Sequence, residues 1–241
     1  MNEEKYTGLI FAMQEEQTGF DHYLSQKQIH KIAQRQFIQA KFGSHKVICV
    51  LAGIGKVAAS MTASIMLDRF PMKQVIMCGV AGGIHQHLHQ GDVVIASELI
   101  QHDMDASPLF PKFEIPLTGK ACVQSDQRMT EQLTHASKQF LASQASTQKA
   151  QVKVGLIASG DQFISDHNRL NQLRNDLPEL LAVEMEGAAI AQVCEAFEVP
   201  FSVIRTISDS ANDEATQDFQ SFIKTTAAPY SIGILKAYFS A

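Results

Sequence analysis

The stretch Val47-Ile-Cys-Val-Leu-Ala-Gly-Ile-Gly-Lys-Val-Ala58 decides the fold class of this 241-residue chain. Its first half is an apolar run rich in β-branched residues, which predicts a buried strand over Val47–Ile54. A helical pattern follows at Lys56–Phe70, and the glycines at 53 and 55 permit a tight turn in which the backbone approaches a neighbour closely. A strand that passes through a short turn into a helix is the unit from which α/β proteins are built.

The same alternation recurs along the rest of the chain. Further strands are predicted at Thr7–Met13, Val75–Val80, Asp92–Ser97, Val152–Ala158 and Phe201–Ile207, and further helices at Gln127–Ser143, Glu186–Phe197 and after Asp218, where Pro229 should break or kink the helix. Strands that alternate with helices favour an α/β fold with a largely parallel, mixed central sheet flanked by helices on both faces. Because 45% of the residues are hydrophobic and no internal repeat is present, we expect a single domain over residues 1–241.

The composition argues against several kinds of partner and location. The formal charge is −5, and Lys and Arg are scattered among acidic residues, so we expect no nucleic acid partner. The four cysteines lie far apart, without the close pairs of a zinc or redox motif. The N-terminus has no basic segment followed by an apolar stretch, and the apolar run Val75–Ile84 is too short to cross a bilayer. We therefore expect a cytoplasmic protein that does not contact membranes.

Polar residues follow several of the predicted strands. In open α/β sheets ligands bind beyond the carboxyl ends of the strands, so these residues are candidates for a site. They are Met13, Glu15 and Glu16; Gly53 to Lys56; Gly79 to Gly83; Ser159 to Ile164; and Ser208 and Asp209.

Arg205 interrupts the apolar strand Phe201–Ile207. Burying a guanidinium is costly unless it meets carboxylates or a ligand. Strand alternation places Arg205 and Asp209 on one side, which fits a shared cleft and equally a structural salt bridge between the two. Glu184 and Glu186 precede a helix and lie two residues apart, so we expect at most one of them to face a pocket.

Two motifs suggest a cofactor or metal, and neither is persuasive. Gly53-Ile-Gly55-Lys-Val-Ala58 loosely matches a dinucleotide fingerprint, but no carboxylate ends the strand Val75–Val80 to hold a ribose, which disfavours a dinucleotide oxidoreductase. His85-Gln-His87-Leu-His89 could gather imidazoles for a metal, but it lies between glycines and is predicted to be a solvated loop. We expect no cofactor and no metal.

Several segments, taken together and in this order, resemble the 5′-methylthioadenosine/S-adenosylhomocysteine nucleosidases, a family within the purine nucleoside phosphorylase superfamily. The resemblance covers nearly the whole chain. It rests on Ala12-Met-Gln-Glu-Glu16, Gly53-Ile-Gly-Lys-Val-Ala-Ala59, Gly79-Val-Ala-Gly-Gly83, Gly91-Asp-Val-Val94, His102-Asp103, Ser159-Gly-Asp161 with Phe163-Ile164, Val183-Glu-Met-Glu186 and Arg205-Thr-Ile-Ser-Asp209. It implies a phosphorylase/nucleosidase-like fold and hydrolysis of the N-glycosidic bond of 5′-methylthioadenosine, S-adenosylhomocysteine and, as a further candidate, 5′-deoxyadenosine.

The resemblance also implies catalytic roles. Glu16 would activate the attacking water and Arg205 would help to position it. Asp209, oriented by Ser208, would protonate N7 of adenine. Elementary chemistry asks for the same pair of acids, because departure of adenine leaves an oxocarbenium-like sugar and needs both a protonated leaving group and a nucleophile.

Binding roles follow from the same resemblance. Met185 and Glu186 would hold the ribose, Phe163 would stack on adenine, and the Ile164 backbone would read the polar edge of the base. The resemblance further implies a homodimer in which the neighbouring subunit borders the pocket for the 5′ substituent. Leu109 and Phe113 are expected to belong to that pocket.

Departures from the family pattern keep alternatives open. Val80 replaces a serine usual in the glycine turn, and Asp105–Phe113 differs from the usual segment, which leaves the preferred 5′ substituent undecided. A phosphate-dependent purine nucleoside phosphorylase is one alternative, although Met77-Cys78 stands where such enzymes of the hexameric type carry an arginine. A non-catalytic nucleoside-binding protein of the same fold is another, and the joint presence of Glu16, Arg205 and Asp209 argues against it.

Overall fold

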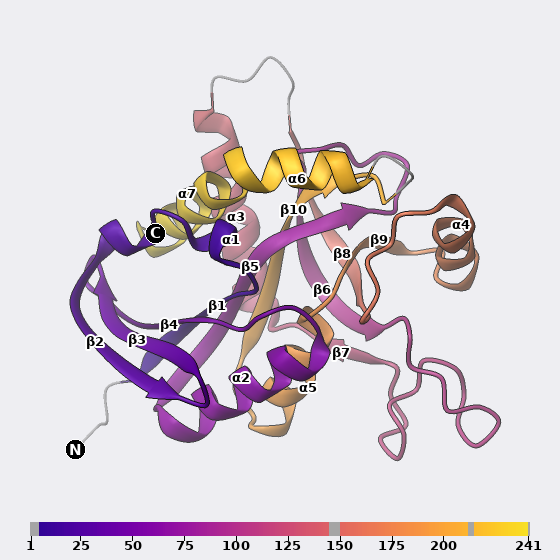
Figure 1. The fold of residues 1–241 in the computed structure, drawn as a ribbon, viewed down its shortest axis with the longest axis horizontal. Helices are drawn as coiled ribbons and strands as arrows, with labels where there is room; N and C mark the ends of the chain where they lie inside the picture. The colour runs from indigo at the N-terminus through magenta and orange to yellow at the C-terminus, as the bar shows by residue number, and fades with distance from the viewer. Residues whose placement is uncertain (1–4, 145–149, 212–214, 241) are drawn as a thin grey trace.

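The structure is a computed structural model that describes residues 5–144, 150–211 and 215–240 (Figure 1). Its strands are β1 (Tyr6–Phe11), β2 (Leu24–Ile32), β3 (Arg35–Phe42), β4 (His45–Leu51), β5 (Met72–Gly83), β6 (Val93–Gln101), β7 (Cys122–Gln124), β8 (Val152–Ser159), β9 (Leu180–Glu184) and β10 (Phe201–Asp209). Its helices are α1 (Gln14–Gln17), α2 (Lys56–Arg69), α3 (Gln127–Ser143), α4 (His167–Asp176), α5 (Gly187–Ala196), α6 (Ala215–Thr225) and α7 (Ala227–Ser240), with a 3-10 turn at Phe20–Tyr23.

All strands belong to one mixed sheet, in the order β10-β6-β8-β9-β5-β1-β4-β3-β2, with β7 on β6. β10 also pairs with β5, so β5, β10, β6, β8 and β9 form a closed ring. The closure was not predicted from sequence. It depends on the antiparallel pairing of Gly82 and Gly83 with Val183 and Ala182, at the point where β5 and β9 meet.

Helices cover both faces of the sheet, and a separate hydrophobic core lies on each face. One core joins the strands to α2 and α5 through side chains such as Met66 and Ile190. The other joins them to α3 and α7 through side chains such as Leu133 and Leu235. The structure thus confirms the predicted α/β fold with a mixed sheet and helices on both faces.

Local patterns account for most element boundaries. The helical region near the C-terminus is interrupted between Thr225 and Ala227, so Pro229 falls in the first turn of α7, where its missing N–H costs nothing. The β2–β3 hairpin, β7, β9 and α4 were not predicted from the sequence. β2 is mostly exposed and polar, so it lacks the apolar run by which the other strands are recognised.

The remaining sequence expectations concern surface and composition. The segment His85 to His89 is a loop between β5 and β6, as predicted. Among residues 5–144, 150–211 and 215–240, no group of three or more His, Cys, Asp or Glu side chains is placed to hold a metal ion. All four cysteines are free thiols. Within the same described ranges, no helix combines the length and apolar character needed to cross a membrane.

Candidate active site

The carboxyl ends of β1, β5, β9 and β10 surround a cavity of about 270 Å³. This placement follows the rule for open α/β sheets on which the candidate residues were chosen. The cavity is lined by Ala12, Met13, Glu16, Ile54, Val80, Ala81, Gly82, Gln162, Phe163, Ile164, Val183, Glu184, Met185, Glu186, Ser208, Asp209 and Phe219.

Glu16 lies in the first turn of α1 and is almost wholly buried. Its Oε2 accepts hydrogen bonds from the backbone N–H groups of Ala12 (2.8 Å) and Met13 (3.0 Å), and its Oε1 accepts one from Val80 N (3.1 Å). Burial raises the pKa of Glu16, and the charge of Arg205 opposes that rise. Since the donor on β5 is a backbone group, valine at position 80 still holds Glu16 in place.

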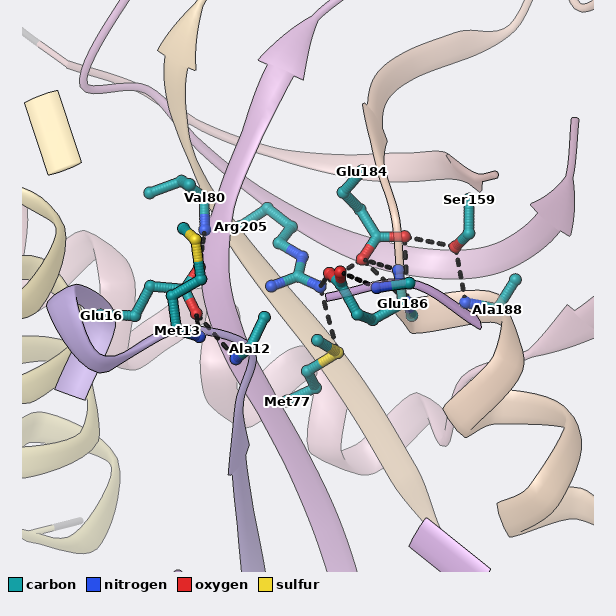
Figure 2. A network of polar contacts seen from close by, with 12 residues as sticks. Ala12, Met13, Glu16, Met77, Val80, Ser159, Glu184, Glu186, Ala188 and Arg205 are labelled. Atoms are coloured by element: carbon teal, nitrogen blue, oxygen red, sulfur yellow. Dashed lines mark hydrogen bonds and ion pairs between the residues drawn. The ribbon is translucent and has the colours of Figure 1, made fainter. Parts of the chain in front are cut away.

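Arg205 is fully buried in the middle of β10, between Glu16 on one side and two glutamates on the other (Figure 2). Its Nη2 forms an ion pair with Glu184 and lies 3.5 Å from Glu186 Oε2. Its Nε and Nη1 have no hydrogen-bond partner among the described residues. A Cβ at Gly79 would overlap both Nη1 and Glu16 Oε1, so only glycine leaves room for this arrangement.

The expectation that Arg205 meets carboxylates is confirmed, but the alternative of a salt bridge to Asp209 is wrong. The pairing of β10 with β5 shifts between Ile207 and Asp209, which breaks the strict alternation assumed from sequence. Arg205 is consequently not among the residues that line the cavity, whereas Asp209 is.

Glu184 and Glu186 both face the cavity, contrary to the expectation that only one would. Glu184 ends β9, and Glu186 precedes α5 with backbone angles outside the helical range, so the turn between strand and helix directs both carboxylates at Arg205. Glu186 Oε1 accepts a hydrogen bond from Gly55 N (2.9 Å). Burial and the adjacent charge of Glu184 raise the pKa of Glu186 to about 8.

The tight-turn interpretation of the Gly53–Lys56 segment is therefore the correct one. Gly53 and Gly55 have positive φ values of 82° and 94°. Gly55 N contacts Glu186, and Lys56 N donates to Asp161 Oδ1 (2.8 Å). The turn thus connects the start of α2 to two segments that line the cavity.

Asp209 and Ser208 end β10 at another wall of the cavity. Asp209 Oδ2 accepts a hydrogen bond from Ser208 Oγ (2.7 Å), and Oδ1 accepts one from Ala211 N (2.9 Å). Burial raises the pKa of Asp209, and these two hydrogen bonds oppose the rise. A carboxyl group in this setting keeps its proton to a higher pH than an exposed aspartate does.

Phe163, Ile164 and Met185 also line the cavity. Phe163 is at the rim, 46% exposed, and its ring meets Phe219 edge-on at 5.6 Å. Phe219 belongs to α6 and was not identified from sequence, since it follows no strand. Glu184 was named only as one of two carboxylates before a helix, because the strand that ends at it, β9, was not predicted.

Leu109 and Phe113 do not line the cavity of their own chain, unlike Phe163, Ile164 and Met185. Both belong to the long segment between β6 and β7, which extends away from the body of the molecule in Figure 1. Leu109 is 84% exposed, and Phe113 packs against a cluster that includes Ile84 and Ile164. Because this segment extends away from the body of the molecule, Leu109 and Phe113 do not reach the cavity of their own chain.

The fold and the cavity define the class of protein. The model of the phosphorylase superfamily matches residues 7–240. A 5′-methylthioadenosine/S-adenosylhomocysteine nucleosidase of Tolumonas auensis is 37% identical over 221 residues, which are 91% of this chain and 93% of the relative. The same-named nucleosidase of Neisseria meningitidis, solved in complex with methylthio-immucillin-A, aligns with a TM-score of 0.90 and 32% identity over 98% of this chain and 99% of that one.

The chain therefore belongs to the 5′-methylthioadenosine/S-adenosylhomocysteine nucleosidase family of the phosphorylase superfamily. Similarity also extends to an enzyme with another name. The futalosine hydrolase of Helicobacter pylori aligns with a TM-score of 0.85 and 31% identity over 98% of this chain and 97% of that one.

Proposed function

We infer that this protein hydrolyses the N-glycosidic bond of 5′-methylthioadenosine and S-adenosylhomocysteine, releasing adenine and the 5-thio-substituted ribose. The observation that carries this inference is a pair of buried carboxyl groups with raised pKa values, Glu16 and Asp209, on separate walls of one cavity. Two separated carboxyl groups can serve the nucleophile and the leaving group of one glycosidic bond.

In the proposed mechanism, Glu16 accepts a proton from the attacking water. The unpartnered Nη1 of Arg205 approaches the same space beside Gly79 as Glu16 Oε1, and it would help to orient that water. Asp209, held by Ser208, would donate its proton to N7 of adenine as the bond to the sugar breaks. The raised pKa of Asp209 favours the protonated form that this step needs.

The binding roles are proposed on similar grounds. Glu186 and Met185 would hold the ribose, since Glu186 has acceptor capacity that the protein leaves unused. The exposed face of Phe163 at the rim suits stacking on adenine. The backbone of Ile164, on the same wall, would read the polar edge of the base.

The charges around the cavity favour water over phosphate as the proposed nucleophile. Its lining, within the part of the chain that the structure describes, contains no lysine, arginine or histidine, and Arg205 is already paired with Glu184. A phosphate dianion is normally bound by several cationic groups. A phosphorylase is therefore the less favoured alternative.

The first test incubates purified protein with a panel of nucleosides in phosphate-free buffer and with added phosphate. The panel is 5′-methylthioadenosine, S-adenosylhomocysteine, 5′-deoxyadenosine, futalosine and inosine. We expect adenine release from the first two at a rate that phosphate does not change, with a free sugar as co-product. A requirement for phosphate together with a sugar 1-phosphate product would refute hydrolysis, and turnover of futalosine alone would refute the substrate assignment.

We further propose that the chain acts in the cytoplasm as a single domain and as a homodimer. Four free thiols are typical of a reducing compartment. In the dimer, the exposed Leu109 and its neighbour Phe113 would border the 5′ pocket of the partner subunit. An exposed apolar side chain on an extended segment is well placed for such a contact.

Truncation of Phe113 to Ala tests the proposed 5′ pocket. We expect the ratio of kcat/KM for S-adenosylhomocysteine to that for 5′-methylthioadenosine to change by about 10-fold, the scale on which apolar pockets discriminate substituents. The matched control is Leu117→Ala, which removes an exposed apolar side chain from the same segment outside 105–113. Equal losses on both substrates, or a control that behaves identically, would assign Phe113 to packing alone.

A further inference from the structure

We propose that Glu184 is a positioning residue that holds the guanidinium of Arg205 and thereby keeps Glu186 and Glu16 available for substrate. This proposal rests on the proposed function, because it concerns the groups assigned there to water and ribose. Glu184 itself would touch neither the sugar nor the base. It would act through Arg205 alone.

The hydrogen bonds that Glu184 accepts leave it little capacity for a ligand. Its side chain is 2% exposed, and it accepts from Ser159 Oγ, from Glu186 N (3.1 Å) and from Gly187 N (2.8 Å), in addition to the ion pair with Arg205. Gly187 N also lies 3.0 Å from its other oxygen. A carboxylate offers about four lone-pair sites, so the protein already uses the capacity of Glu184.

Glu186, two residues further along the chain, still has capacity to accept hydrogen bonds from a ligand. Among the residues that the structure describes, its Oε1 accepts a single hydrogen bond, from Gly55 N, and its Oε2 has only the 3.5 Å contact with Arg205 Nη2. Figure 2 shows both carboxylates on the same side of the guanidinium. The protein thus saturates one carboxylate and leaves the other with free acceptor positions, which is the division expected of a positioning group and a ligand-binding group.

The ion pair with Glu184 also sets the orientation of Arg205. Because Nη2 is held on the Glu184 side, Nη1 is directed to the space beside Gly79 that it shares with Glu16 Oε1. Without the charge of Glu184, the nearest carboxylate for Nη2 would be Glu186. The guanidinium would then occupy acceptor positions that the ribose hydroxyls need, and Nη1 would turn from Glu16.

The central test compares Glu184→Gln with the wild type in crystal structures, in kcat and KM, and in the pH profile of kcat/KM. We expect the guanidinium to move toward Glu186 and kcat to fall by about 10- to 100-fold, as when partners that orient active-site ligands are removed. The charged groups that face Glu16, the proposed base, are Arg205 and Glu186. Arg205 lowers the pKa of Glu16, so its movement toward Glu186 should raise that pKa and shift the acidic limb of the profile to higher pH.

Two further variants separate positioning from a structural role. Ser159→Ala removes one donor to Glu184 and the acceptor of Ala188 N but keeps the charge of Glu184. It should lower kcat by about 2- to 10-fold without moving the acidic limb. It also keeps the proposal testable if Glu184→Gln fails to fold, since an unchanged kcat would then count against it. Asp126→Asn alters the N-cap of α3, outside the cavity, and should behave as wild type.

The outcomes distinguish this proposal from the proposed function. Wild-type protein that releases no adenine would refute the function, while an unmoved guanidinium in the Glu184→Gln crystal structure would still overturn the positioning role. With an active wild type, kcat within about twofold of normal in Glu184→Gln would overturn it. A loss of kcat in Glu184→Gln without a shift of the acidic limb of the pH profile would also overturn it. Glu184 would then act only as a cap for the first N–H groups of α5.

Discussion

Replacing Asp209 with Asn is expected to lower kcat by about 10²–10⁴-fold, the usual contribution of a general acid, with little effect on nucleoside binding. Asn has nearly the shape of Asp but cannot supply the proton in the way that a carboxylic acid can. The measurement is steady-state adenine release together with the affinity for a non-hydrolysable adenine nucleoside. Near-normal kcat in a folded Asp209→Asn protein would remove this residue from the mechanism.

The fold should tolerate this change well. The amide oxygen of Asn can still accept from Ala211 N, and the amide NH₂ can donate to Ser208 Oγ, whose hydroxyl can turn to Ala81 O at 3.3 Å. Burial raises the pKa of Asp209, so the folded protein carries a cost when this group ionises at neutral pH. A neutral Asn avoids that cost, and we expect the midpoint of thermal unfolding at pH 7 to stay level or rise.

Glu16→Gln is the second change with a large expected effect, and it should lower kcat by about 10²–10⁴-fold because an amide cannot take a proton from water. Here the fold should suffer as well. All three partners of Glu16 are backbone donors, from Ala12, Met13 and Val80. The NH₂ of Gln would face at least one of these N–H groups and leave it unsatisfied, at a cost of about 1–3 kcal/mol.

The two variants are therefore expected to differ in stability while agreeing in activity. Unfolding in urea, measured side by side, should show a lower midpoint for Glu16→Gln and not for Asp209→Asn. The double variant should lose less activity than the product of the two single losses, since both groups serve one transition state. Full activity in Glu16→Gln, or independent losses in the double variant, would contradict the concerted mechanism.

Much of the candidate site could be predicted from the sequence, because the site lies where strands end. Glu16, Ser208 and Asp209 follow β1 or end β10, and all three line the cavity. The same rule missed Phe219, which reaches the cavity from α6 and follows no strand. It also did not place Glu184 at a strand end, because β9, the short strand that ends at this residue, was not predicted.

The amino-acid sequence by itself determined the features that depend on neighbours along the chain. Apolar runs defined β4, β5, β8 and β10, and Gly53 and Gly55 marked a turn whose positive φ values any other residue would adopt only with strain. The order of its motifs determined the family. Each of these features is set within a few residues, so it can be read from a local pattern.

Only the tertiary structure decided which groups meet. The partner of Arg205 and the closure of the sheet both depend on the register of strands more than 100 residues apart, such as Gly82 opposite Val183. A local pattern contains no information on that register. A shift of one residue in a strand moves every side chain to the other face, so the ion pairs of a buried site follow from long-range pairing and not from spacing along the chain.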